Sequence, residues 1–186
     1  MDGKGKIIAA GVTYVNYLKT NAVVVRYSGD GTIDSTFGKH GKSVTQVDGY
    51  YVTASDMQLQ DNNKVLFAGQ ISNGPVTTIG NFLLCRLDST GLPDSSFDED
   101  GMVITDFNDV FSLNSYDAPN TIQLQKDGNI LVSGVSEVET EPHALTYFSI
   151  ARYRGDPTKP HPLITKIKRW IRNHILNFES TGNGDI

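Results

Sequence analysis

The chain has little of what would place it in several common protein classes. Its 186 residues include one cysteine, Cys85, so neither an intrachain disulfide nor a cysteine metal cluster can form. Lysine and arginine number 16 against 21 acidic residues, a net charge of −5, whereas nucleic-acid binding normally needs a basic face. No apolar run approaches the ~20 residues of a transmembrane helix. We therefore expect no nucleic-acid partner and no transmembrane segment.

Two further absences concern reactivity and export. Cys85 lies within an apolar run, residues 81–85, so we expect a small buried side chain; a reactive thiol needs an exposed, electropositive setting. The first residues lack the long apolar segment and small-residue cleavage site of a signal peptide. The sequence opens in the middle of a repeat unit, so one hypothesis is that it is part of a longer propeller chain whose export signal lies elsewhere.

A gapless repeat organises the chain. Residues 23–45 and 83–105 align at an offset of 60 residues. The shared positions are Arg26/Arg86, Gly31/Gly91, Asp34-Ser35/Asp94-Ser95, Phe37/Phe97, Gly41/Gly101 and Thr45/Thr105. Tandem units of this length are typical of repeat architectures such as propellers.

A second motif recurs out of phase with the first. Three copies of a short apolar strand, 6–11, 64–69 and 129–134, end in Gly11, Gly69 and Gly134. Asp-Gly-like turns precede them, which is a strong hairpin signal. The arginine-bearing strand also occurs three times, and Arg152 is its third arginine.

These patterns predict an all-β chain of four-stranded antiparallel repeats of β-propeller type, about two and a half blades. The expected strands lie near residues 6–11, 21–28, 42–47, 53–60, 64–71, 80–88, 102–107, 119–125, 129–136 and 146–153. Such a chain could be a fragment, an open arc of blades, or a propeller closed by oligomerisation. A β-sandwich is the alternative architecture, although sandwich strands need not repeat in sequence.

The second and third strands of each unit are separated by segments that differ freely, 12–20, 72–79 and 136–145. Repeat proteins place such variation on one edge, often the binding edge. We expect these insertions to be loops that contact a partner.

The combined pattern resembles the delta-60 repeat family, a β-propeller-type repeat. The resemblance rests on Gln-Leu-Gln-Lys-Asp-Gly-Asn-Ile-Leu-Val-Ser-Gly at 123–134, Ile-Ala-Arg-Tyr at 150–153 and Asp-Gly-Thr-Ile-Asp-Ser-Thr-Phe-Gly at 30–38. It covers residues 1 to about 156, with departures at Lys126, Pro93 and Asp98. The resemblance implies a bacterial protein that is secreted or lies on the cell surface, and it implies no activity.

The composition changes after the repeats. We expect a repeat domain over 1–155, a Pro-rich linker over 156–162, an amphipathic helix over 163–178 and a flexible tail over 179–186. Apolar residues of the helix recur at helical spacing, with lysine and arginine off that stripe. The helix could dock on the repeats, join a following domain, or lie on an anionic membrane.

The repeated polar residues are interpreted as structural. Asp34 and Asp94 are expected to cap the turns that follow them, and Phe37 and Phe97 to pack against the sheet. The alternative is a calcium site near Asp94, but the spacing does not fit an EF-hand.

The repeated arginines are expected to pair with the acidic turn of the same or the next unit. The same interpretation covers Gly69 and Gly134, so the structural repeat residues are Arg26, Arg86, Arg152, Asp34, Asp94, Phe37, Phe97, Gly69 and Gly134.

Catalytic motifs are missing from the sequence. The four histidines, His40, His143, His161 and His174, show no metal-ligand or acid–base pairing, and neither a nucleophile elbow nor a phosphate-binding loop is present. We therefore expect no catalytic, cofactor or metal site, and a non-enzymatic scaffold that binds a protein or glycan. The alternatives are an enzyme whose site is assembled across blades and a pure structural spacer.

Overall fold

The computed structural model describes residues 3, 5–16, 19–74, 79–107, 115–140 and 143–155. This part of the chain is all-β, with antiparallel pairing between neighbouring strands, and the predicted fold class is confirmed. Its strands are β1 (Ile7–Asn16), β2 (Lys19–Tyr27), β3 (Lys42–Thr45), β4 (Tyr51–Val52), β5 (Asp56–Leu59), β6 (Val65–Ser72), β7 (Gly80–Leu87), β8 (Met102–Thr105), β9 (Ser115–Leu124), β10 (Ile130–Thr140) and β11 (His143–Tyr153). The described residues include no helix of the length and apolarity that crossing a bilayer takes.

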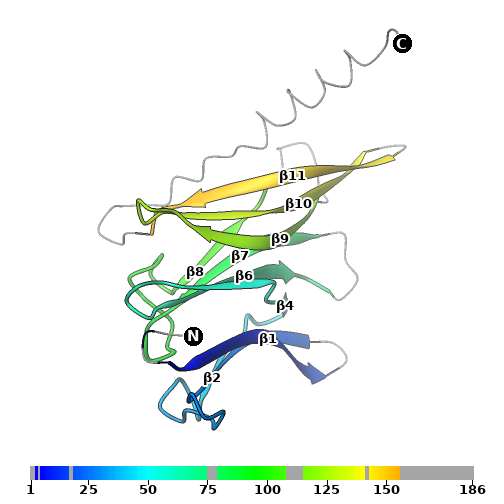
Figure 1. Ribbon diagram of the computed structural model, residues 1–186. Helices are drawn as coiled ribbons and strands as arrows, with labels where there is room; N and C mark the ends of the chain where they lie inside the picture. Colours follow the sequence, from blue (N-terminus) through cyan, green and yellow to red (C-terminus); the bar gives the residue numbers. More distant parts are fainter. Residues whose placement is uncertain are drawn as a thin grey trace, which may run out of the picture.

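The strands form three stacked units, which we call blades 1, 2 and 3 (Figure 1). Blade 1 is β1–β2–β3, blade 2 is β4 and β5 followed by β6, β7 and β8, and blade 3 is β9–β10–β11. Blades 2 and 3 are joined by a single parallel bridge, Gly80 to Tyr116. All other described pairings between strands lie within one blade and are antiparallel, as the four-stranded unit predicted.

The strand pairings differ from the sequence prediction in the variable segments. β1 and β2 remain paired as far as Asn16 and Lys19, and β10 and β11 as far as Thr140 and His143. The expectation of loops over 12–20 and 136–145 was therefore wrong for most of these residues. Each added residue pair extends the hydrogen-bond ladder of an antiparallel hairpin, so an insertion of paired length lengthens the two strands.

The motif glycines mark a bend in the neighbouring strand. The strand predicted over 53–60 begins only at β5 (Asp56), because residues 53–55 separate it from β4. This break lies opposite Gly69, where a Cβ atom would meet the Thr53 carbonyl oxygen at 1.8 Å. In blade 3 the register shifts at Gly134, where a Cβ atom would lie 2.1 Å from the Ala118 oxygen. Glycine recurs there because the backbone of the adjacent strand approaches too closely for any side chain.

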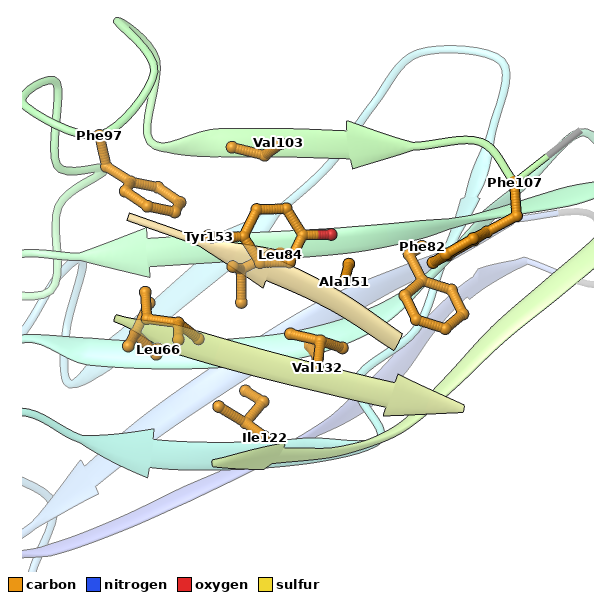
Figure 2. Packing of buried hydrophobic residues seen from close by; sticks show 12 residues of the cluster. Leu66, Phe82, Leu84, Phe97, Val103, Phe107, Ile122, Val132, Ala151 and Tyr153 are labelled. Atoms are coloured by element: carbon orange, nitrogen blue, oxygen red, sulfur yellow. The ribbon is translucent and has the colours of Figure 1, made fainter. Parts of the chain in front are cut away.

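The hydrophobic core lies between the blades. Blade 2 alternates its side chains, so Val65, Phe67, Leu83 and Cys85 pack toward blade 1, with Ala22, Val24 and Phe37. Leu66, Ala68, Phe82 and Leu84 pack toward blade 3, with Ile122, Ile130, Val132, Ala151 and Tyr153 (Figure 2). Each blade is therefore stabilised mainly by its neighbours.

The predicted linker 156–162, helix 163–178 and tail 179–186 lie outside the described residues.

Candidate functional site

The turn after β2, which we call corner 1, brings the first set of repeated residues together. Asp34 accepts hydrogen bonds from the Thr36 backbone N–H at 3.2 Å and the Thr36 hydroxyl at 2.6 Å, the geometry of an Asx turn. Its other carboxylate oxygen binds Arg26 Nε at 2.8 Å and Lys6 Nζ. The Arg26 guanidinium lies 4.6 Å from the centre of the Phe37 ring. The spacing shared by the two repeats thus brings these residues into one compact cluster.

Corner 2, the turn after β7, repeats this cluster in blade 2. Asp94 accepts hydrogen bonds from the Ser96 backbone N–H at 3.1 Å and from the Ser96 hydroxyl at 2.6 Å. It also forms ion pairs with Arg86 Nε at 2.6 Å and with Lys64 Nζ at 2.7 Å. Arg86 stacks on the Phe97 ring at 4.5 Å and is 1% exposed. A planar guanidinium serves here because it can bond in its plane and stack on its face at once.

Each corner arginine also reaches the next blade. Arg26 Nη1 donates to the carbonyl oxygen of Ser89 in blade 2 at 2.8 Å. Arg86 Nη1 donates to the carbonyl oxygen of Gly155, after the last strand of blade 3, also at 2.8 Å. Ser89 and Gly155 are each the third residue after the arginine of their own blade. The contact therefore repeats in register, and we call it the arginine clamp.

Arg152 occupies the same strand position in blade 3 but has different contacts. Its Nε donates to Gln125 Oε1 at 2.7 Å, and its Nη2 binds Asp127 at 2.6 Å. The side chain is 43% exposed. Within the described residues it does not form the corner cluster. At the positions of the Asp-Ser-x-Phe turn the sequence of the third copy reads Pro160-His161-Pro162-Leu163, which lies outside the described residues.

The corner carboxylates are strongly acidic. A hydrogen bond from Lys6, followed by one from Thr36, lowers the pKa of Asp34. Burial opposes ionisation of Asp94, but hydrogen bonds from Lys64 and Ser96 and the charge of Arg86 outweigh it and lower its pKa to about 2. Burial lowers the pKa of Arg86, and Asp94 opposes that effect. Both carboxylates are thus held ionised as partners of cations.

The acidic stretch 98–100, which belongs to the alternative calcium site weighed near Asp94, lies exposed at the end of corner 2. Asp98 and Glu99 adopt positive φ angles of 50° and 64°, and Asp100 accepts a hydrogen bond from the Met102 N–H at 2.8 Å. No group of three potential metal ligands occurs among the residues described. The backbone of Asp98 and Glu99 and the side chain of Asp100 thus form the turn that leads into β8.

A groove of about 570 Å³ lies between corner 1 and corner 2. Ile33, Leu92 and Pro93 give it an apolar lining, and Lys39, His40 and Lys42 lie around them. Such a lining suits a ligand with an apolar body and a negative charge. Of the other histidines, His143 begins β11, whereas His161 and His174 lie outside the described part of the chain.

A second exposed apolar surface lies at the far end of β1. Val12, Tyr14 and Val15, which we call the β1 arm, are 37%, 78% and 57% exposed. They belong to the first variable segment and lie in β1, where Val12 and Tyr14 pair with β2 and Val15 lies at a register shift. The sequence pattern placed the variation correctly but predicted a loop.

The lysines of the corners were missed at the sequence level. Lys6 and Lys64 begin the repeated strand that ends in glycine, and each binds the carboxylate of its own blade. Blade 3 has Asn129 at this position. The sequence did contain a signal for this pairing. Lysine recurs in the two units that have the acidic turn, and it is replaced in the unit that lacks the turn.

The sequence analysis also did not predict a role for two aspartates that link neighbouring blades. Asp56 accepts from the Ile122 N–H at 2.8 Å and the Thr121 hydroxyl at 2.9 Å, joining β5 to β9. The buried Asp117 accepts from the Phe107 N–H at 2.9 Å and from the Ser136 hydroxyl. Neither residue belongs to a repeated motif, so the sequence held no pattern that would single them out.

The comparisons with known proteins concern the first unit. The model of the family described as "Domain of unknown function (DUF5122) beta-propeller" matches residues 5–37, which comprise β1, β2 and the start of corner 1. No curated protein matches the chain. Together with the three antiparallel blades and their repeated corners, this match indicates a β-propeller-type repeat domain of unknown function.

Proposed function

We propose that the chain is a non-enzymatic scaffold of delta-60-type repeats that binds a protein through its variable segments. The observation that carries the proposal is the β1 arm, where Val12, Tyr14 and Val15 are exposed on a paired strand. Aromatic side chains are enriched at the centres of protein interfaces, and contiguous exposed apolar surface marks interaction sites. Since a strand holds these side chains in place, little conformational entropy is lost on binding.

The rigid blades support this role. The corner clusters and the interblade core hold the three blades together, whereas the segments between the second and third strands differ in sequence from unit to unit. A constant framework with variable exposed segments is the usual arrangement of binding repeats. The exposed aliphatic side chains of Val12 and Val15 in the same segment favour a protein surface over a glycan.

Photo-crosslinking tests the binding site. A benzophenone amino acid replaces Tyr14 in one variant and Val44, which is 52% exposed in the same blade, in the control. After irradiation in the source organism, the proposal expects one defined protein bound at position 14 and not at position 44. Identical products at both positions, or none, would contradict it, and a carbohydrate product would assign a glycan instead.

We further propose that the protein acts outside the cell or on its surface, as the delta-60 resemblance implies. Protease added to intact cells should then digest the protein while a cytosolic marker survives. Equal protection of both would contradict this location.

A further inference from the structure

The groove between corner 1 and corner 2 gathers apolar side chains that are open to solvent. Its lining comes from corner 1 and β3 on one side and from residues 91–93 of corner 2 on the other, around a volume of about 570 Å³. Ile33, Val44 and Leu92 are 49%, 52% and 56% exposed, and all three line it. Exposed apolar side chains that lie together mark a binding surface, whereas single ones need no explanation.

Lys39 and Lys42 bring two positive charges to this groove. They lie directly opposite each other in a tight hairpin, where the Lys39 N–H donates to the Lys42 carbonyl oxygen at 2.7 Å and the Lys42 N–H donates back at 3.2 Å. His40 and Gly41 form the two-residue turn, with φ angles of 54° and 86°. Like charges on directly opposed residues are destabilising. An anion bound by both ammonium groups would relieve that repulsion.

Neither lysine has a carboxylate partner in the part of the chain that the structure describes. There, Lys6, Lys19 and Lys64 each form an ion pair, whereas Lys39 and Lys42 form none. The described residues that line the groove include no aspartate or glutamate. On a chain whose net charge is −5, the groove is therefore a local positive site that a negatively charged ligand complements.

Comparison of the two repeat units separates the groove from the structural repeat. The Arg-Asp-Phe cluster of the corner is the same in both units. The counterparts of Lys39, Lys42 and Leu92 in the other unit are Glu99, Met102 and Thr32. Corner 2 builds its cluster with Glu99 in place of Lys39, so the corner does not require a lysine there. The positive charge belongs to this groove and not to the repeat.

The two corners hold the groove in a fixed shape. The Gly38 N–H donates to the carbonyl oxygen of Thr90 at 2.7 Å, which joins blade 1 to blade 2. Gly91 lies so close to corner 1 that a Cβ atom would be 2.8 Å from the Gly38 nitrogen and 2.8 Å from the Phe37 ring. A site that is already formed loses little conformational entropy on binding.

We propose that this groove binds a small amphiphilic anion, a molecule with an apolar body and one anionic group. The apolar body packs on Ile33, Val44 and Leu92, and the anionic group binds Lys39 and Lys42. The volume lies within the ~300–1,000 Å³ of small-ligand sites, whose linings are mostly apolar with a few polar groups that fix the orientation of the ligand. This site is separate from the β1 arm, which lies at the other end of β1.

The rest of the chain does not suit the groove. Blades pack through the faces of their sheets, and the groove lies between two blades that are already packed on each other. In residues 156–186, Lys and Arg number five against three Asp and Glu, so this segment has the same sign of charge as the groove. Segments 75–78 and 108–114 are attached to strand ends remote from corner 2, because β7 and β8 each have corner 2 at their other end.

Fluorescence titration of the full 186-residue chain with 8-anilinonaphthalene-1-sulfonate, an aromatic body with one sulfonate, tests the site. The wild-type chain should bind it saturably, and decanoate should displace it far better than decanol or inorganic phosphate does. A Lys39→Gln/Lys42→Gln variant keeps most of both side chains without their charge, and it should bind at least about tenfold more weakly. Lys126→Gln is the control, since Lys126 is exposed in blade 3 outside the groove, and it should bind as the wild type does.

A second pair of variants tests the apolar lining. Leu92→Ser should weaken binding about fivefold or more, by loss of a buried aliphatic contact. Ile104→Ser, at a residue 50% exposed outside the groove, should not, and circular dichroism establishes that each variant folds. The proposal is overturned if the wild-type chain shows no saturable binding, if either variant binds as tightly as its control, or if phosphate displaces the probe as well as decanoate does.

Discussion

Replacing Arg86 by alanine should destabilise the chain far more than the same change at Arg152. Arg86 is 1% exposed, and its guanidinium binds Asp94, the Ser96 hydroxyl at 3.0 Å and the Gly155 carbonyl. Arg152 is 43% exposed and pairs with an Asp127 side chain that is 53% exposed. The two arginines therefore share a repeat position and differ in burial and partners.

The expected magnitudes follow from that difference. Removing one member of a buried ion pair costs about 3–5 kcal/mol. Lys64 remains beside Asp94 in the variant, so we expect a loss of about 3 kcal/mol, at the low end. Arg152→Ala removes an exposed pair and should cost about 0–1 kcal/mol. Arg86→Lys, which keeps the charge without the planar fork, should fall between the two.

Urea unfolding followed by circular dichroism measures these losses, at protein concentrations where the chain sediments as a monomer. Linear extrapolation gives the free energy of unfolding, and an unchanged slope shows that the same surface is exposed in each variant. The reasoning is refuted if Arg86→Ala loses no more stability than Arg152→Ala.

Three further outcomes follow from the corners, the bulges and the core. The folded pKa of Asp94 is about 2, below its ordinary value of 3.8, so its contribution to stability is present above pH ~4 and is lost as the pH falls through 2; urea midpoints should show a smaller acid loss in Asp94→Asn. Gly69→Ala should cost about 1–3 kcal/mol by thermal or urea unfolding, because its Cβ would meet the Thr53 oxygen at 1.8 Å. Gly11→Ala, where a Cβ atom would have nothing within 4 Å, should not destabilise the chain, and an equal loss in both variants would contradict the explanation by close backbone approach. Burial raises the pKa of the Cys85 thiol, so a thiol reagent should modify it only as fast as the chain unfolds, and rapid labelling of the folded protein would disagree.

Sequence periodicity was sufficient for the blades because repetition encodes them directly. The 60-residue offset between Arg26 and Arg86 paired positions that do lie at equivalent places in blades 1 and 2. Alternation within β6 and β7 separates the two faces of blade 2. Strand ends were less accessible, because whether an insertion becomes a loop or a longer hairpin depends on cross-strand pairing that a single segment does not display.

Contacts between blades were largely beyond the sequence. The partner of Arg86 in the next blade is a backbone carbonyl, which every residue possesses, so no residue type marks Gly155 as its acceptor. Asp117 lies in a segment without a repeated counterpart, and the hydrogen bond that it accepts from the Phe107 N–H depends on how blades 2 and 3 stack. Lys64 could have been assigned, since it recurs with the acidic turn.

The central claim is that the repeated arginine couples successive blades, and hydrogen exchange in Arg86→Met tests it most directly. Mass spectrometry of peptides would compare protection with that of the wild-type chain. Because Arg86 binds both corner 2 and the Gly155 carbonyl, protection should fall over residues 85–105 and also over the end of β11. A loss confined to blade 2, with β11 unchanged, would contradict the arginine clamp.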